Sequence, residues 1–251
     1  GKLAAYILNF ACDAAQAGIT TDEIDRATHN EIIKAGAYPS PLHYNGFPKS
    51  ICTSINECAA HGIPDDRKLQ FGDVINIDIT VYKDGVHGDT SRTLIIGSRE
   101  EVGDDIHFDK AEKLLKTAHA ALLEGIKQCR PGVSSSVIGQ VVEDLVEGAG
   151  LQVIPNLVGH GIGEYFHEKP FISSTRIPSA DSVELKENMV FTIEPIIKCA
   201  GSDRIVMWED NWTIVTEDQE LSAVFEHTIL ITKDSCEILT LAEAGVPPCI
   251  H

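Results

Sequence analysis

The sequence predicts an α+β protein made of two related halves, because an internal repeat places helix and strand patterns in the same order twice. Gly18-Ile19-Thr20-Thr21 aligns with Gly132-Val133-Ser134-Ser135 at an offset of 114 residues. No linker of low complexity separates the two regions. We therefore expect residues 1–251 to form a single domain, whose halves span about 1–97 and 108–240 and are related by a pseudo-twofold axis.

The first helix of each half is predicted from its apolar spacing. Leu3–Ala17 and residues 111–128 both repeat apolar side chains at helical intervals. Asp109 and Glu112 have the spacing of a capping box, so we expect the second of these helices to begin at this point.

A second helix follows in each half. Thr20 and Ser134-Ser135 supply hydroxyl groups suited to an N-cap, and Gly36 and Gly150 stand where a C-terminal glycine would end the helix. Strand-like sequence comes after each of these helices, which gives the helix–helix–strand order of both halves.

Lys83-Asp84-Gly85-Val86 predicts a tight β-hairpin turn in the first half. With a two-residue loop, Asp78 falls opposite Ser91 and Asp89 points to the same face as Asp78. The two carboxylates are then diagonal neighbours that one metal ion can bridge. A three-residue loop would send Asp89 to the other face. A pair of solvent-facing acids on an edge hairpin is the alternative.

Polar residues occupy places where the local pattern predicts an apolar or inert residue. They are Asp78, Asp89, His160, Glu194 and Glu226. A carboxylate inside a buried strand is costly unless a cation neutralises it, and no Lys or Arg lies within three residues of Asp78 or Glu194. Four oxygen ligands and one imidazole suit one or two divalent metal ions.

The composition describes an acidic folded protein and argues against nucleic-acid binding. Of the 251 residues 43% are apolar, and the formal net charge is −18. Because a phosphate-binding surface needs clustered Lys and Arg, which are scattered here, we expect no direct contact with nucleic acid. No apolar run reaches the roughly 18 residues of a membrane span, so we expect no membrane partner.

The chain carries no visible secretion signal, and its seven cysteines contain no Cys-x-x-Cys. That cysteine pattern fits free thiols in a reducing compartment better than disulfides or a zinc ribbon. We expect a cytoplasmic protein, or an organelle protein if a targeting segment was trimmed before Gly1. No exposed apolar helix stripe demands a partner, so we expect a monomer.

Histidines in loops add to the predicted site. His61 opens a turn-rich loop before the strand of Asp78, and His167 follows seven residues after His160. A lone loop histidine is usually a surface residue, but several near predicted metal ligands favour a function. The sequence lacks a His-Glu-x-x-His helix, a Gly-x-Ser-x-Gly elbow and a phosphate-binding loop. Cys52 beside a histidine would suit a thiol protease, yet the acidic residues favour a metal site, with Cys52 in a pocket wall.

A series of motifs runs through the chain in a fixed order. They are Tyr44-Asn45-Gly46-Phe47-Pro48-Lys49-Ser50, Ser54-Ile55-Asn56-Glu57, His61-Gly62-Ile63-Pro64-Asp65, Asn76-Ile77-Asp78, His87-Gly88-Asp89-Thr90, Gly159-His160-Gly161-Ile162-Gly163, Phe191-Thr192-Ile193-Glu194-Pro195, Trp212-Thr213 and Phe225-Glu226-His227-Thr228. Over essentially the whole chain, they closely resemble the motifs of type I methionine aminopeptidases. The resemblance implies a pseudo-symmetric pita-bread fold, shared with creatinase, in which helices flank a central antiparallel sheet.

The same resemblance implies removal of the N-terminal methionine from nascent proteins and peptides, with a preference for a small second residue. Two divalent ions would activate a water for attack on the first peptide bond. Asp89 and Glu226 would bridge the ions, and Asp78 would chelate one of them. His160 and Glu194 would hold the other. The ions are Co, Mn, Fe or Zn, among which the ligand set does not choose.

Substrate contacts are implied as well. Glu194 would shuttle the proton, and His61 and His167 would contact the substrate amide and the tetrahedral intermediate. The methionine side chain would lie in a pocket built by Tyr44, Cys52, Phe166 and Trp212. A polarizable thioether suits such an aromatic-lined pocket, and a small space beyond it would favour a small second residue.

Three segments depart from the family pattern. They are His43-Tyr44-Asn45 at the pocket rim, Val224 where Gln is common, and Glu187-Asn188-Met189 where Gly usually precedes Met. None removes a ligand, so they bear on pocket polarity and on the support of Glu226. Phe47 is interpreted as packing, and His29, His43, His119 and His227 as structural.

Two alternatives stay open. Prolidases and proline-specific aminopeptidases share the fold and the ligand set, but normally carry a further N-terminal domain. A binding protein that has lost catalysis would lack ligands, whereas all five are present here together with His61 and His167. The expected partners are Met-starting peptides of nascent chains, and any ribosome association would rest on surface features that the sequence does not expose.

Overall fold

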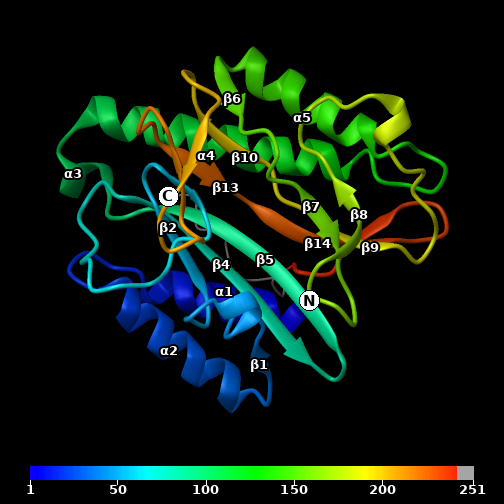
Figure 1. Ribbon diagram of the computed structural model, residues 1–251. Coiled ribbons are helices and arrows are strands. Elements are labelled where there is room, and N and C mark those ends of the chain that lie inside the picture. Colours follow the sequence, from blue (N-terminus) through cyan, green and yellow to red (C-terminus); the bar gives the residue numbers. More distant parts are fainter. Residues whose placement is uncertain (242–251) are drawn as a thin grey trace.

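The computed structural model describes residues 1–241, which form a curved antiparallel sheet, two smaller sheets and a layer of helices (Figure 1). The helices are α1 (Lys2–Ala14), α2 (Thr21–Lys34), α3 (Arg99–Val102), α4 (Asp105–Ile126) and α5 (Ser136–Gly148), with 3-10 turns at Tyr44–Gly46 and Ser179–Asp181. The strands are β1 (Tyr38–Pro39), β2 (Cys52–Ile55), β3 (Cys58–Ala60), β4 (Val74–Lys83), β5 (Val86–Ile95), β6 (Leu151–Val153), β7 (Gly159–Gly161), β8 (Glu168–Ile172), β9 (Val190–Ile193), β10 (Ile196–Cys199), β11 (Ile205–Met207), β12 (Ile214–Thr216), β13 (Ser222–Val224), β14 (Glu226–Ile231) and β15 (Cys236–Ile238).

The large sheet joins the first and last parts of the chain. Its order is β1-β4-β5-β14-β9-β7-β8, with β2 also paired to β4 and β15 also paired to β14. The smaller sheets have the orders β13-β10-β6 and β11-β12-β3. The α+β prediction with a central antiparallel sheet is confirmed. No helix among residues 1–241 is long and apolar enough to cross a membrane.

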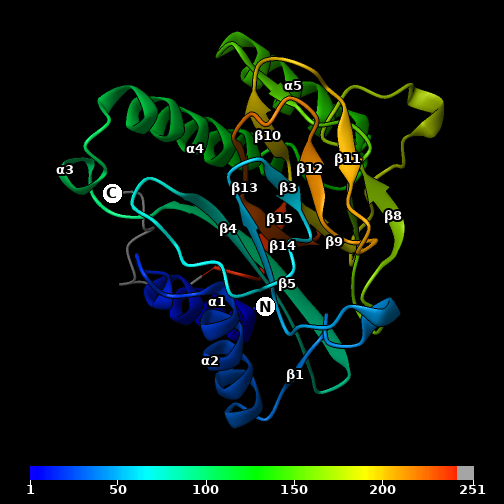
Figure 2. The same ribbon diagram turned by 60° about the vertical axis from the view of Figure 1, so that its left-hand side comes forward.

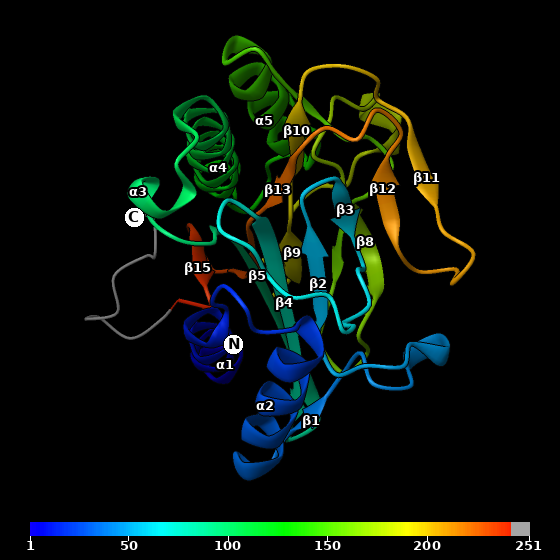
Figure 3. The same cartoon turned by 90° about the vertical axis from the view of Figure 1, so that its left-hand side faces the viewer.

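The long helices lie on one side of the strands, as Figure 3 shows. Helices α1 and α2 cover one end of the large sheet, and α4 and α5 cover the other (Figures 1 and 2). One apolar core lies between α1, α2 and β4, and a second lies between α4, α5 and the strands β9, β10 and β14. With this face covered, the functional side chains lie on the opposite face of the sheet.

Helix α2 begins as its sequence predicts. The Thr20 hydroxyl accepts from the Glu23 N–H, and the Glu23 carboxylate accepts from the Thr20 N–H, so both halves of a capping box are present. Gly36 has φ 68°, which is the left-handed conformation expected just after a helix.

The predicted start of α4 is wrong. The helix begins at Asp105, and the Asp104 carboxylate accepts from the His107 N–H. Asp109 instead forms an ion pair with Arg99. The apolar face of the helix extends to Phe108, which is buried. Because this added contact with the core stabilises the first turn, the helix begins about one turn earlier than predicted.

For α5 the Ser135 hydroxyl forms no cap, but the Ser134 hydroxyl accepts from the Ser136 N–H at 3.3 Å, and Gly150 has the left-handed conformation expected at the helix end. The Ser135 hydroxyl accepts from the Val183 N–H instead of capping the helix. Of the two predicted serines, Ser134 therefore makes the local contact, and Ser135 makes a tertiary contact with the segment that precedes β9.

The two repeat segments make equivalent backbone hydrogen bonds. The N–H groups of Gly18 and Gly132 donate to the carbonyls of Leu69 and Leu185 respectively. Leu69 and Leu185 donate back to the residues that follow each glycine. This equivalence supports the division into two related halves, which stays a prediction.

Candidate metal centre

The β4–β5 hairpin brings the first two acids together. Asp84 has φ 52° and Gly85 φ 90°, and Asp78 pairs with Ser91 as expected for a two-residue loop. Asp89, two residues from Ser91, therefore lies on the same face as Asp78. The predicted hairpin register is confirmed.

Strand β14 places a third acid in the same row. Glu226 pairs with Ser91 from the other side of β5, so Asp78, Ser91 and Glu226 lie side by side across three strands. Paired residues of an antiparallel sheet project to one face, which brings Glu226 beside Asp78 and Asp89. These residues come from opposite ends of the sequence, and only the closure of β5 on β14 unites them.

His160 and Glu194 complete the group from β7 and the end of β9. The His160 Nε2 atom lies 3.7 Å from Asp89 Oδ2 and 3.7 Å from Glu194 Oε1. A Cβ atom at Gly159 would lie 2.2 Å from the Thr192 carbonyl oxygen, so the close approach of β7 to β9 requires glycine there. The glycines around His160 thus act by letting the strands pack closely.

The electrostatics of the group call for added positive charge. Burial raises the pKa of Asp89 well above its usual range, and the nearby Asp78 and Glu194 carboxylates raise it further. Burial raises the pKa of Asp78 to about 7 and that of Glu194 to about 8, and burial and Asp89 raise the pKa of Glu226. Within residues 1–241, no Lys or Arg forms an ion pair with these acids.

A divalent metal fits this donor set. Ligand atoms of Asp89, His160 and Glu226 all lie within 4.8 Å of one another. Carboxylate oxygens with one imidazole nitrogen suit a divalent first-row metal, and the cation would offset the repulsion that raises the pKa values. His160 is well prepared as a ligand, because burial lowers its pKa and favours the neutral ring.

The group lies in a cavity of about 250 Å³. The residues expected at the site all line it: Tyr44, Cys52, His61, Asp78, Asp89, His160, Phe166, His167, Glu194, Trp212 and Glu226. Asn45, expected at the pocket rim, lines it too, and so do Pro41, Phe47 and Thr80, which were not predicted there. Acids therefore occupy one part of the cavity, and aromatic rings enclose the rest.

One wall consists of Tyr44, Phe166 and His167. The Tyr44 hydroxyl is hydrogen-bonded to His167 Nδ1 at 3.0 Å, and the Tyr44 and Phe166 rings lie 4.8 Å apart. Burial, with the neighbouring His160 and His61, lowers the pKa of His167 to about 3. His167 is therefore neutral and holds one N–H donor and one acceptor nitrogen.

Phe47, Trp212 and His61 form a second group of rings that lines the cavity. The Phe47 ring meets the Trp212 ring edge-on at 5.1 Å, and the His61 ring lies 6.0 Å from Trp212 in the same kind of contact. Phe47 is 2% exposed, which agrees with a packing role, yet it also lines the cavity. Burial lowers the pKa of His61 and so favours the neutral imidazole.

Two threonines orient the acids and were missed in the sequence. Thr80 faces Asp89 across the hairpin and donates to its Oδ1 atom at 2.8 Å. The Thr192 hydroxyl donates to Glu194 Oε1 at 2.7 Å and accepts from the His160 N–H at 3.0 Å. Each threonine lies two residues from a strand acid, on the same face, and this spacing is a signal that could have identified both.

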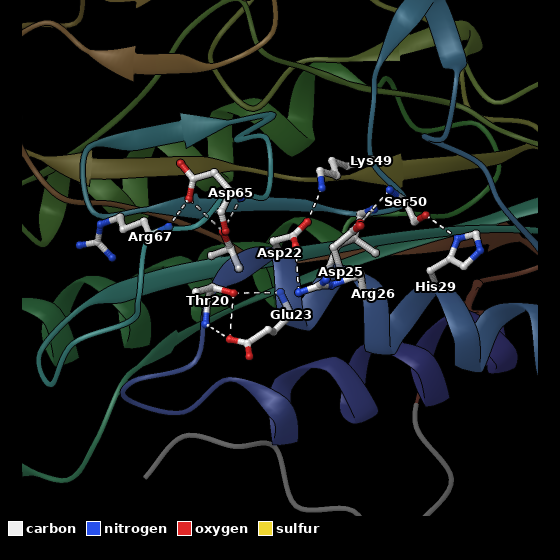
Figure 4. Close-up of polar contacts among 12 residues, drawn as sticks. Thr20, Asp22, Glu23, Asp25, Arg26, His29, Lys49, Ser50, Asp65 and Arg67 are labelled. Carbon is white, nitrogen blue, oxygen red and sulfur yellow. Dashed lines mark hydrogen bonds and ion pairs between the residues drawn. The ribbon is translucent and has the colours of Figure 1, made fainter.

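Helix α2 holds the loop that precedes β2 (Figure 4). The buried Asp25 carboxylate accepts from the N–H groups of Ser50 and Ile51 at 2.8 and 3.2 Å. His29 is hydrogen-bonded to the Ser50 hydroxyl at 2.8 Å, which confirms its structural role. In sequence this loop connects Tyr44 to Cys52, two residues that line the cavity. Helix α2 therefore anchors the segment between them.

A second set of contacts ties α2 to the loop of His61. The Asp65 N–H donates to the Thr21 hydroxyl at 2.8 Å, and the Asp22 N–H donates to the Asp65 carbonyl at 2.8 Å. His61 itself has φ 55°, a conformation that bulky residues seldom adopt without support. Both loops at the cavity are thus anchored to one helix.

The departures from the family pattern have local explanations. Asn45 and Asn188 have φ 48° and 70°, the left-handed region that asparagine tolerates better than most residues. The Val224 carbonyl accepts from the Asn76 side-chain amide and from the Thr93 hydroxyl, so side chains of β4 and β5 hold the backbone just before Glu226.

Residues 1–233 match the model of metallopeptidase family M24, and the chain therefore belongs to that family. Within it, the most similar relatives include an Arabidopsis thaliana protein named methionine aminopeptidase 1D, chloroplastic/mitochondrial. The two are 51% identical over 96% of this chain and 65% of the relative. A Homo sapiens protein named methionine aminopeptidase 1D, mitochondrial, is 47% identical over 95% of this chain and 68% of the relative.

The solved structures agree with this placement. The structure of methionine aminopeptidase from Rickettsia prowazekii has a TM-score of 0.89 and 43% identity, covering 96% of this chain and 93% of that one. The pita-bread fold expected from the motifs is thereby confirmed. The chain spans just under two thirds of the length of the Arabidopsis relative.

Proposed function

We propose that this protein is a methionyl aminopeptidase, a hydrolase that removes the N-terminal methionine from peptides and nascent proteins. The observation that carries the proposal is one cavity in which four acids and a histidine adjoin an aromatic pocket. The similarity to proteins named methionine aminopeptidases supports the same substrate.

We propose two divalent ions per chain, drawn from Co, Mn, Fe and Zn, as the cofactors. Asp89 and Glu226 would be shared by both ions, Asp78 would bind one, and His160 with Glu194 the other. The row of Asp78, Ser91 and Glu226, with Asp89 beside it, supports this division. Bound there, such ions would supply a nucleophile at neutral pH and Lewis acidity at the scissile carbonyl.

The protein side chains would prepare the substrate and move the proton. The Thr192 hydroxyl donates to Glu194 Oε1 and orients this carboxylate, which would accept a proton and return it to the leaving amine. His167, kept neutral and hydrogen-bonded to Tyr44, would contact the peptide group or the tetrahedral intermediate. His61, which lies against Trp212, would contact the substrate amide.

The pocket would select the methionine side chain. The rings of Tyr44, Phe166 and Trp212 with the thiol of Cys52 make a compact lining, to which an unbranched thioether is suited. A cavity of about 250 Å³ leaves little space beyond that side chain, which supports a preference for a small second residue.

The test is hydrolysis of two peptides in the presence of Mn²⁺, followed by mass spectrometry. One peptide starts Met-Ala-Ser and the other Ala-Pro-Ser. Release of methionine from the first alone supports the proposal. Cleavage of the second alone would assign the protein to the proline-specific branch. No cleavage of either, with bound metal measured in the sample, would indicate a binding protein.

The relatives' names favour an organelle over the cytoplasm that the sequence led us to expect, because they place those proteins in mitochondria or chloroplasts. We propose a mitochondrial or plastid location for the protein. Subcellular fractionation with an antibody against this chain tests it, and recovery in the cytosolic fraction would contradict it.

A further inference from the structure

A pair of thiols lies at the C-terminal end of α4, outside the cavity. Cys129 follows this helix, and Cys236 is the first residue of β15. The Cys129 thiol donates to the Gly125 carbonyl at 3.7 Å, and the Cys236 thiol donates to the Ile126 carbonyl at 3.5 Å. The two thiols therefore lie beside neighbouring carbonyls at the end of one helix, close enough for each to affect the pKa of the other. Residues far apart in sequence thus bring two thiols close together.

Hydrogen bonds and strand pairing fix the backbone at both cysteines. The Cys129 N–H donates to the Ile126 carbonyl at 2.9 Å, and Cys236 pairs with Ile231 of β14. Cys129 is buried in the core beneath α4 and α5, whereas Cys236 is half-buried at the edge of the same core. A reagent in solution can therefore reach Cys236 more easily than the buried Cys129.

We propose that Cys129 and Cys236 form an oxidative modification site, a dithiol that a small-molecule disulfide such as oxidised glutathione converts into an intramolecular disulfide. The Cys236 thiolate attacks one sulfur of oxidised glutathione, giving a mixed disulfide and one glutathione thiolate. Cys129 then loses its proton to solvent and attacks the Cys236 sulfur, which releases the second glutathione. The protein loses two electrons, and the glutathione disulfide gains them.

The difference in exposure assigns the order of these steps, because Cys236 is half-buried and Cys129 is buried. The neighbouring Cys129 also lowers the pKa of Cys236, which favours the nucleophilic thiolate. The neighbouring Cys236 and burial raise the pKa of Cys129, which favours its protonated form until the mixed disulfide removes the neighbouring charge. Cys236 is the attacking thiol and Cys129 the resolving thiol.

The cross-link would tie α4 to the strand that extends the sheet beside β14. It closes a loop of roughly 100 residues, a length at which a disulfide strongly restricts the unfolded chain. Neither cysteine lines the metal cavity, so this inference does not depend on the proposed peptidase activity.

The test uses the purified wild-type protein in buffers with a graded ratio of reduced to oxidised glutathione. Peptide mass spectrometry without reduction should find Cys129 joined to Cys236, and oxidation should raise Tm by roughly 5–15 °C. Cys236→Ser should abolish both effects. Cys58→Ser is the matched control, because Cys58 is half-buried but donates to the Ala60 carbonyl rather than to a thiol.

Three outcomes would overturn the inference. They are a stable glutathione adduct on Cys236 without the cross-link, a disulfide from Cys236 to another cysteine, and both thiols still reduced when the free glutathione is almost wholly oxidised. Because the wild-type protein itself is analysed, poor folding of a variant does not obscure the result.

Discussion

Asp78 and Asp89 lie one diagonal step apart on the paired strands β4 and β5, and both carboxyl groups line the same cavity. Asp89 is buried and Asp78 is half-buried. Burial raises the pKa of both carboxyl groups, and the Asp78 carboxylate raises that of Asp89 further. A folded protein tolerates such an arrangement when a cation binds between the acids. The predictions about the metal centre begin from this pair.

Asp89→Asn is expected to lose bound metal and peptidase activity together. The amide cannot supply the charge that two ions would share, so we expect activity to fall by at least about 100-fold. Metal content by elemental analysis and the rate of methionine release measure the two effects. Asp84→Asn, in the turn of the same hairpin, is the control and should keep both. An Asp89→Asn protein with full metal content and activity would refute the shared-ligand role.

Asp89→Asn is expected to stabilise the metal-free protein but to destabilise the protein in the presence of metal. Without metal, removing one of the crowded acids relieves repulsion, so Asp89→Asn should have a higher Tm than the wild type in a chelating buffer. In saturating Mn²⁺ the wild type should be the more stable, because a ligand that binds the folded state stabilises it. Thermal unfolding of both proteins in both buffers measures this reversal. A wild-type Tm that does not respond to Mn²⁺ would contradict it.

Trp212→Ala is expected to raise KM for Met-Ala-Ser peptides by roughly 10-fold or more, since the ring closes one wall against Phe47 and His61. Metal content should stay unchanged, because Trp212 is not one of the proposed metal ligands. Trp208→Ala is the matched control, a tryptophan four residues earlier that is 54% exposed. Equal effects of the two substitutions would argue against a pocket role for Trp212.

Asp25→Ala is expected to weaken substrate binding although Asp25 does not line the cavity. The N–H groups of Ser50 and Ile51 would lose their acceptor in a buried place, at a cost of about 1–3 kcal/mol. We expect a lower Tm and a higher KM with metal content retained. Asp25→Asn keeps one acceptor oxygen and should recover part of the loss. Lys34→Ala, on the exposed side of the same helix, should change neither, and an unchanged KM in Asp25→Ala would limit the contact to stability.

The Asp73–Arg67 pair should make stability depend on acid pH. Burial acts to raise the pKa of Asp73, but the Arg67 guanidinium, at 2.7 and 2.9 Å, and two further donors outweigh it and hold the pKa below its usual range. This contribution is present above the unfolded pKa of about 3.9 and is lost as the pH falls through the lower folded value.

Asp73→Asn should therefore lower Tm at pH 7 by roughly 2–6 °C, allowing for the partial exposure of Arg67. The difference from the wild type should shrink towards pH 3, where the wild-type carboxyl is also neutral. Asp66→Asn, exposed in the same loop, is the control. A difference that stays constant with pH would show that the charge of Asp73 is not responsible.

The sequence by itself determined the elements whose signals are local. The Asp84-Gly85 turn fixed the hairpin register and hence the shared face of Asp78 and Asp89, because a side-chain period of two leaves no freedom once the loop length is set. Thr20 and Glu23 determined the start of α2 in the same way. The family motifs supplied the fold and every residue expected at the cavity, although the ligand roles stay predictions.

Only the tertiary structure decided features that depend on distant partners. Ser135 bonds to Val183 rather than capping α5, and α4 starts earlier because Phe108 reaches the core. The meeting of Glu226 with Asp78 through Ser91 requires β5 to pair with β14. The contact of Cys129 with Cys236 is equally invisible in the sequence. Hydrogen bonds within a turn or cap depend on neighbours along the chain, whereas packing and burial depend on which segments the fold brings together.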